Sequence, residues 1–179
     1  MAHTYSKIAT YTVGSGGVTT VSFLNIPQTY TDLVLTTSSR TDSGTADDVL
    51  VCYFNSNQTG YSSKRAYGSG TGTGSDSLSN SNGGTSGSRI LVGSISSAGG
   101  TSNCFGNASM YIPNYTKEQY KSTSSEGVQS NNTTTSYQLM SAGLWSNTAP
   151  ITSITLGAYW SNTFVQHSTF HLYGIKAEV

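Results

Sequence analysis

Residues 48–55 read Asp-Val-Leu-Val-Cys-Tyr-Phe-Asn, and residues 32–38 read Asp-Leu-Val-Leu-Thr-Thr-Ser. Both runs are short, rich in β-branched and aromatic residues, and bounded by polar residues, which is typical of β-strands. The run at 48–55 is apolar on both of its faces, which predicts a strand in the middle of a layered sheet structure. These two stretches indicate a β-sheet protein.

Further strand patterns lie on both sides of these two runs, at 5–13, 18–23, 89–96, 105–112, 136–145, 151–160 and 168–176, with weaker ones at 62–67 and 119–125. The glycine-rich turn at 14–17 predicts a hairpin between the first two of them. About ten strands at this spacing, without a βαβ unit, predict an all-β fold. We expect a jelly-roll-like antiparallel β-sandwich, a single domain over 1–179, with both terminal strands held in the sheet. A trimer-forming β-prism or another sandwich topology is the alternative.

The stretch from Gly68 to Ser88 consists almost wholly of Gly, Ser, Thr and Asn, and Leu78 is its one large apolar residue. Such a composition is typical of flexible linkers and surface loops. The sequence therefore predicts a long Gly/Ser-rich loop at 68–88.

Charged residues make up only 9% of the chain, against roughly 25% in an average globular protein, and 8 basic residues balance 8 acidic ones. Without a basic excess the chain is a poor candidate for nucleic-acid binding. No apolar run approaches the roughly 20 residues that cross a bilayer, so no membrane partner is expected. The first residues lack the apolar segment of a secretory signal, which predicts synthesis in the cytoplasm.

No Asp, Glu, Lys or Arg occurs between Gly127 and Ile175. An isolated monomer usually keeps surface charge for solubility, whereas interface cores are poor in charge and rich in aromatic residues. Either Ser, Thr, Asn and Gln hydrate this third of the chain, or part of it lies against other subunits. The residues predicted to contact a partner are aromatic: Tyr111, Tyr115, Trp145, Trp160 and Phe164.

The candidate metal ligands are sparse. His167 and His171 would share one face of a strand but lie roughly 13 Å apart, too far for one ion. Asp42, Asp47 and Asp48 surround a glycine turn, where a Ca²⁺ site is the alternative to a solvated loop. We therefore predict no metal.

The two cysteines, Cys52 and Cys104, belong to no zinc or redox motif. Without an export signal, buried free thiols are favoured over a disulfide between them, which stays the alternative.

No catalytic motif is present. No serine stands in a GxSxG or SxxK pattern, and no Gly-rich stretch is followed by GK[ST] or by a predicted helix. The few acids and histidines are spread over the whole chain, so a pocket of titratable groups is hard to assemble. We predict neither an enzyme nor a cofactor.

Several segments together resemble virion structural proteins of tailed bacteriophages. They are Ser6-Lys-Ile-Ala-Thr10, Val13-Gly-Ser-Gly-Gly17, Ile26-Pro-Gln-Thr-Tyr-Thr-Asp-Leu-Val-Leu35, Met110-Tyr-Ile-Pro-Asn-Tyr115, Ala149-Pro-Ile-Thr-Ser-Ile-Thr-Leu156 and Leu172-Tyr-Gly-Ile175. The resemblance spans most of the chain except residues 68–88. It implies a component of a virus particle.

Within that class the chain looks most like a capsid decoration (cement) protein. The resemblance implies a homotrimer that binds the major capsid protein on the outside of the shell and bridges its subunits. The alternative is a tail-fibre or tailspike module that recognises host glycans, for which the candidates are Tyr61, Tyr67, Tyr111, Tyr115, Tyr120 and Asn114. A third hypothesis, a glycan-processing enzyme, predicts a cleft with paired carboxylates.

Overall fold

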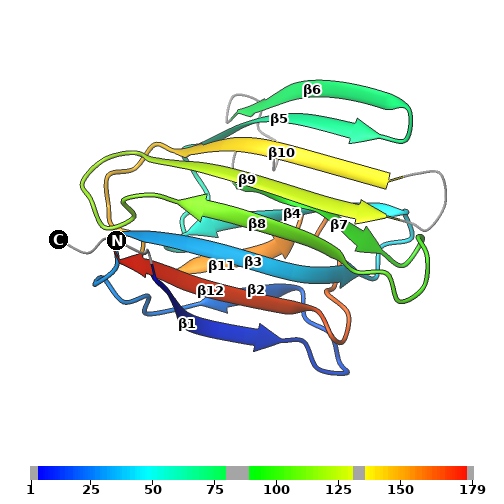
Figure 1. The fold of residues 1–179 in the computed structure, drawn as a ribbon, viewed down its shortest axis with the longest axis horizontal. Helices are drawn as coiled ribbons and strands as arrows, with labels where there is room; N and C mark the ends of the chain where they lie inside the picture. The colour runs from blue at the N-terminus through cyan, green and yellow to red at the C-terminus, as the bar shows by residue number, and fades with distance from the viewer. Residues whose placement is uncertain (1–3, 80–88, 131–135, 177–179) are drawn as a thin grey trace.

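The computed structural model describes residues 4–79, 89–130 and 136–176, and every regular element within them is a β-strand. The strands are β1 (Thr4–Thr12), β2 (Thr20–Phe23), β3 (Asp32–Thr41), β4 (Asp47–Phe54), β5 (Tyr61–Ser69), β6 (Gly72–Ser79), β7 (Ile90–Ser97), β8 (Gly106–Ile112), β9 (Lys121–Ser130), β10 (Ser136–Trp145), β11 (Ile154–Ala158) and β12 (Thr169–Lys176) (Figure 1). The all-β prediction is confirmed, with twelve strands in place of about ten.

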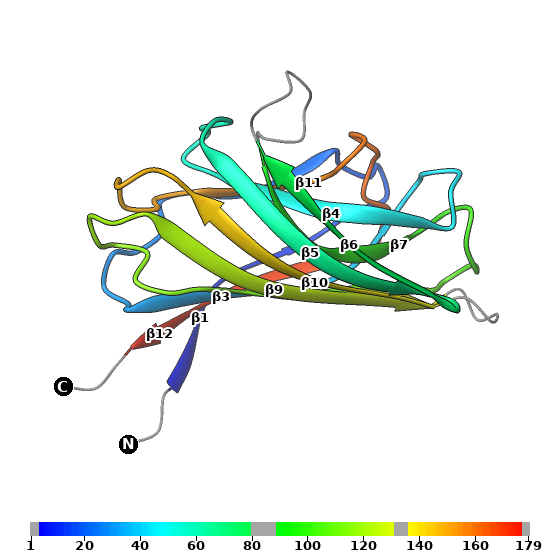
Figure 2. The ribbon, with the colours of Figure 1, turned by 90° about the horizontal axis from the view of Figure 1, so that it is seen from above.

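The twelve strands form one mixed sheet that is folded into two layers (Figure 2). The large layer has the strand order β1-β12-β3-β8-β9-β10-β5-β6, and all of its pairs are antiparallel. The small layer has the order β2-β11-β4-β7, also antiparallel. The layers join where Arg40 and Thr41 of β3 run parallel to Ser96 and Ser97 of β7.

Most of the buried apolar side chains lie between the two layers. β4 contributes Leu50, Cys52 and Phe54, which pack in one cluster with Leu35 of β3 and Leu172 of β12. β4 pairs with β11 on one side and β7 on the other, and six of its eight residues are buried. The prediction of a central strand at 48–55 is therefore confirmed. Burying a large apolar side chain stabilises the fold by about 1.5–3 kcal/mol.

Three aromatic side chains close one end of this core. The ring of Trp145 stacks on Tyr61, with centroids 6.0 Å apart, and meets the ring of Phe54 edge-on. The Tyr61 hydroxyl accepts a hydrogen bond from the Phe54 N–H at 2.8 Å and donates one to the Asn57 carbonyl at 2.9 Å. The cluster ties the end of β4 to β5 and β10.

The predicted hairpin between residues 5–13 and 18–23 is wrong. β1 pairs with β12, and β2 pairs with β11. Directly after β1, the Val13 N–H donates to the Ser168 carbonyl, and the Val13 carbonyl accepts from the His167 N–H. The hydrogen bonds of β1 therefore continue along the segment before β12 and not along β2. Both terminal strands do lie in the sheet, as predicted.

The predicted loop at 68–88 is also largely wrong, because β5 and β6 form a hairpin that turns at Gly70, where φ is +57°. β6 consists mostly of Gly, Ser and Thr, and β5 supplies larger side chains. Arg65 forms an ion pair with Asp76 across the hairpin at 2.7 Å, and the Tyr67 ring covers Gly74. Cross-strand pairs of this kind stabilise a strand whose own residues are mostly small. Residues 80–88 of the predicted loop lie outside the described residues.

Candidate functional site

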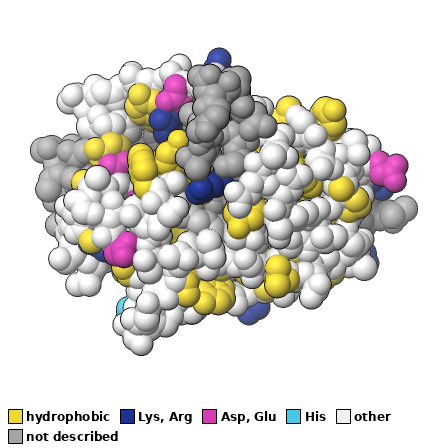
Figure 3. All heavy atoms as spheres, turned by 180° about the vertical axis from the view of Figure 1, so that it is seen from behind, with side chains coloured by type: hydrophobic (Ala, Val, Ile, Leu, Met, Phe, Trp, Pro, Cys, Tyr) yellow, Lys and Arg dark blue, Asp and Glu magenta, His cyan; other side chains and the backbone are white. Residues whose placement is uncertain are grey.

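The face of the small layer that points away from the core carries an apolar cluster of its own. Val49 and Val51 of β4 and Leu91 of β7 form this cluster, and Tyr159 packs against it. β5 adjoins β7 on this side, where the Ser63 hydroxyl accepts a hydrogen bond from the Leu91 N–H at 3.3 Å. Viewed from behind, most of the molecule is neither charged nor hydrophobic, and the hydrophobic side chains form several small patches (Figure 3).

Two hollows lie along this side. The first, of about 250 Å³, lies between β4 and β7 on one side and β5 and β10 on the other, and we call it the Trp160 hollow. Its lining residues are Asp47, Val49, Arg65, Tyr67, Ser69, Ser94, Tyr137, Gln138, Leu139 and Trp160.

Aromatic rings form part of the Trp160 hollow. Trp160 follows β11 in a tight turn, in which Ser161 adopts a φ of +62° and donates from its N–H to the Ala158 carbonyl. The turn leaves the Trp160 side chain 61% exposed. Tyr159 meets it edge-on with ring centroids 4.9 Å apart, which holds the indole in place. A large exposed and oriented ring is a platform for a ligand.

The charges in the Trp160 hollow are unequally satisfied. Arg65 donates two hydrogen bonds of 2.7 Å to Asp76, an interaction that raises the Arg65 pKa, and its guanidinium lies 5.1 Å from the centre of the Tyr67 ring. The Asp47 carboxylate accepts no hydrogen bond from another side chain among the described residues. Burial, and then the neighbouring Asp48, raise the pKa of Asp47, and its own backbone N–H and the Arg65 guanidinium oppose this with smaller effects. Asp47 is thus an acceptor without a side-chain donor.

Ser94 provides a second unsatisfied group. It lies opposite Val49 in the pairing of β4 with β7 and lines the Trp160 hollow. Its side chain is 3% exposed, and its hydroxyl has no hydrogen-bond partner among the described residues. Other buried hydroxyls of the described residues, those of Thr37, Ser39, Thr123 and Ser141, also lack a partner, but Ser94 is the one of them that lines this hollow. A buried hydroxyl without a partner beside a hollow is a place for a ligand or a water molecule.

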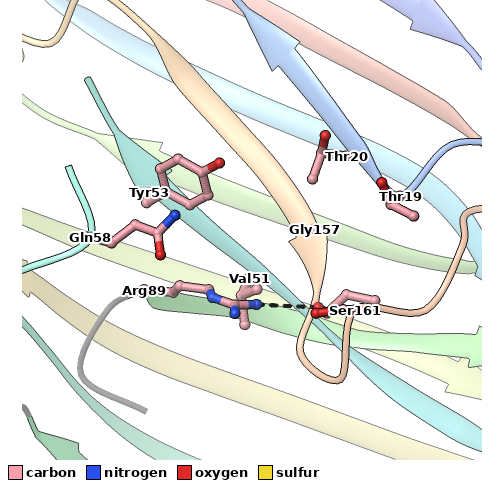
Figure 4. Close-up of a pocket in the computed structure, with 9 residues that line it drawn as sticks. Thr19, Thr20, Val51, Tyr53, Gln58, Arg89, Gly157 and Ser161 are labelled. Atoms are coloured by element: carbon pink, nitrogen blue, oxygen red, sulfur yellow. Dashed lines mark hydrogen bonds between the residues drawn. The ribbon is translucent and has the colours of Figure 1, made fainter. Parts of the chain in front are cut away.

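The second hollow, of about 300 Å³, is the Arg89 hollow. Its lining residues are Thr19, Thr20, Val51, Tyr53, Gln58, Arg89, Gly157, Ala158 and Ser161 (Figure 4). Arg89 reaches across its floor towards the end of β11, where Nη1 lies 3.4 Å from the Ala158 carbonyl and 3.5 Å from that of Tyr159. Contacts of this length hold the guanidinium weakly.

The aromatic residues predicted to contact a partner do not form one site. Tyr115, Trp145 and Phe164 are buried in the core of their own chain, and the Tyr115 hydroxyl donates to the Pro27 carbonyl. Their prediction as contact residues is therefore corrected: large aromatic side chains are as suited to a core as to an interface. Tyr111 is 39% exposed, and its hydroxyl donates to Asp32 at 2.8 Å. Trp160 is the only one of these residues in either hollow.

The described residues contain no group of three His, Cys, Asp or Glu side chains that is placed to hold a metal ion. Asp48 turns into the structure, where it accepts hydrogen bonds from Thr41 and Asn162, while Asp42 accepts one from the Thr163 N–H. His171 lies 3.0 Å from the Thr10 hydroxyl in the β1–β12 pair.

Both cysteines are free in the structure, so the alternative of a disulfide between them is wrong. Cys52 is buried beside Met110, and burial raises the pKa of its thiol. Cys104 is half-buried and donates to the Ser130 carbonyl at 2.6 Å. The described residues also include no helix that is long and apolar enough to span a membrane.

Sequence reasoning identified Trp160 but missed Asp47 and Ser94 as its neighbours, since these residues come from three distant segments. The chain matches no protein-family model, no curated protein and no solved structure. A function for it is therefore proposed from its geometry and from the motifs that its sequence carries.

Proposed function

We propose that the chain is a structural protein of a tailed-phage virion without enzymatic activity, namely a capsid decoration protein that binds the outside of the shell. In this proposal it forms a homotrimer, bridges subunits of the major capsid protein and stabilises the shell. The jelly-roll class predicted from the sequence is part of the same proposal. The observation that carries it is the outer face of the large layer.

That face is broad, and no other described element covers it (Figure 1). Strand register places on it an apolar set of side chains: Tyr5, Val34, Tyr111, Val128, Met140 and Tyr173. The same register gives it only a few charges: Lys7, Asp32, Lys64 and Glu126. Ser and Thr fill most of the remaining positions. Removing water from a broad face with little charge costs little free energy, and the cores of protein interfaces are likewise poor in charged residues.

Repetition supplies the affinity that one such face lacks. Copies placed by the symmetry of a shell engage many contacts at once, so modest individual contacts add up to stable attachment. A fold held together by a two-layered core and antiparallel pairing presents the face rigidly. Rigidity limits the conformational entropy that is lost on binding.

The glycan-recognising alternative is supported by a separate observation, the Trp160 hollow with its exposed ring and unsatisfied polar groups. A receptor-binding module would be present in few copies on a tail, whereas a decoration protein approaches the copy number of the shell protein. Mass quantitation of the chain against the major shell protein in purified particles separates the two hypotheses.

The decoration proposal is tested by sedimenting purified chain with shells of the phage that encodes it. Val128→Glu and Met140→Glu place charge on the outer face of the large layer, where both native side chains are exposed, and should abolish attachment. Thr20→Glu, at an exposed position of the small layer, is the matched control and should attach normally. A chain that is monomeric by light scattering and fails to sediment with shells would refute the proposal.

A further inference from the structure

We propose that the Trp160 hollow binds a neutral saccharide, with one sugar ring stacked on Trp160 and its hydroxyls hydrogen-bonded to the Asp47 carboxylate and the Ser94 hydroxyl. This inference goes beyond the proposed decoration function and does not depend on it. It is carried by three groups that the fold brings to one place from β4, β7 and the turn after β11.

Trp160 provides the stacking surface. A pyranose ring presents a face of C–H groups that packs on an aromatic ring, much as apolar side chains do. The indole is 61% exposed in the free protein and is already oriented by Tyr159, so little conformational entropy is lost when a ring settles on it. Tyr67, which is 39% exposed, lines the same hollow.

Asp47 and Ser94 provide the polar contacts. The Asp47 carboxylate has no side-chain donor among the described residues and keeps acceptor sites for sugar hydroxyls beside the bond from its own N–H. A hydrogen bond to a charged group is stronger than one between neutral groups. The buried Ser94 hydroxyl has no partner among the described residues and is free both to donate and to accept. A sugar hydroxyl at this position would satisfy it, which favours a hydroxyl-rich ligand over an apolar one.

Charge disfavours an anionic ligand. The Arg65 guanidinium is paired with Asp76, so the unpaired charge among the lining residues is that of Asp47, which repels an anion. An ammonium group would be attracted by Asp47, but a quaternary ammonium group offers neither a donor nor an acceptor to the Ser94 hydroxyl, whereas a sugar hydroxyl offers both. The volume of about 250 Å³ is below the ~300–1,000 Å³ of pockets for drug-sized ligands, which indicates a single sugar ring.

The experiment screens the full chain on an array of neutral and acidic glycans and then titrates the free neutral sugar that binds best, by calorimetry. We expect saturable binding with a Kd of about 1 mM, as befits one ring and a few hydrogen bonds. Choline and glucuronate are titrated in parallel. Ligand binding should also protect Trp160, but not the buried Trp145, from quenching of its fluorescence by acrylamide.

Three variants locate the site. Trp160→Ala should weaken sugar binding at least tenfold, and Ser94→Ala should weaken it several-fold without lowering the stability of the free protein, because an unsatisfied hydroxyl is removed. Tyr120→Ala, at an aromatic residue that is 58% exposed outside the hollow, should bind normally. The inference is overturned if no neutral saccharide on the array binds, if only choline or glucuronate binds, or if Trp160→Ala binds sugar as well as Tyr120→Ala does.

Discussion

A Cβ atom added to Gly93 of β7 would lie 2.8 Å from the Cα atom of Gly127 in β9, because the two strands meet backbone to backbone. Packed sheets usually lie about 10 Å apart, the space that two sets of side chains occupy. The two layers come closer than that here. β7 crosses the inner face of β9 over glycine and small hydroxyl side chains, and the Ser125 hydroxyl donates to the Leu91 carbonyl at 3.1 Å.

Gly127→Ala should therefore destabilise the protein by about 3 kcal/mol, since the new methyl group meets backbone atoms that cannot rotate away. The measurement is the midpoint of urea unfolding, followed by circular dichroism. Gly14→Ala is the matched control, because a Cβ atom at Gly14 meets no atom within 4 Å. Equal stability of the two variants would contradict the close approach of the layers.

The same crossing explains why the sequence indicates β9 only weakly. Its residues alternate strictly between buried and exposed, but the buried positions hold Lys121, Thr123, Ser125, Gly127 and Gln129. A reading based on hydrophobic periodicity looks for large apolar residues at such positions. Thr123, Ser125 and Gly127 are small because β7 lies directly over them, and the local sequence does not reveal that contact.

Features that depend on local residues were predictable from the sequence, and features that depend on distant contacts were not. The central strand β4 was predictable because its own apolar residues identify it, whereas the pairing of β1 with β12 depends on contacts between the two ends of the chain. Trp160 stood out as an aromatic residue in an uncharged segment. Its hollow could not be predicted, because Asp47 and Ser94 reach it only through the pairing of β4 with β7 and through the turn that follows β11.

Asp47→Asn should stabilise the protein at neutral pH. Burial and Asp48 raise the pKa of Asp47 in the folded protein above its ordinary value of 3.8, so folding is penalised wherever this carboxylate is ionised. The penalty is complete above the folded pKa, shrinks as the pH falls through it, and vanishes below 3.8. The thermal unfolding midpoint of Asp47→Asn should exceed that of the native protein at pH 7 and coincide with it near pH 3.

Glu118→Gln is the control for this pH series. Glu118 is exposed in the segment between β8 and β9, so its neutralisation should leave the unfolding midpoint unchanged at either pH. If Asp47→Asn behaves like Glu118→Gln at pH 7, the Asp47 carboxylate is better solvated than its surroundings indicate.

Lys121→Met should cost about 3 kcal/mol of stability. Lys121 is fully buried, and its ammonium donates hydrogen bonds to the carbonyls of Lys117, Gln119 and Thr148. Burial lowers the pKa of Lys121, yet these carbonyls give the charge its partners. Methionine fills a similar volume but leaves the carbonyls without their donor. Urea unfolding measures the loss, and Lys64→Met at an exposed position should unfold at the native midpoint.

Tyr61→Phe should lower the free energy of unfolding by about 1–3 kcal/mol without disturbing the aromatic cluster. The Tyr61 hydroxyl accepts from the Phe54 N–H, and burial raises the pKa of Tyr61, so the hydroxyl keeps its proton and also donates to Asn57. Removing it leaves a buried N–H and a carbonyl without that partner. The ring itself still stacks on Trp145.

The readout for Tyr61→Phe combines urea unfolding with tryptophan fluorescence. The midpoint should fall, while the emission maximum of the folded variant stays at the native wavelength, because the apolar surroundings of Trp145 are preserved. Tyr120→Phe, which removes a hydroxyl from a side chain that is 58% exposed, should change neither quantity. A shifted emission maximum in Tyr61→Phe would mean that the hydroxyl also positions the ring against Trp145, in addition to accepting the hydrogen bond from the Phe54 N–H at the end of β4.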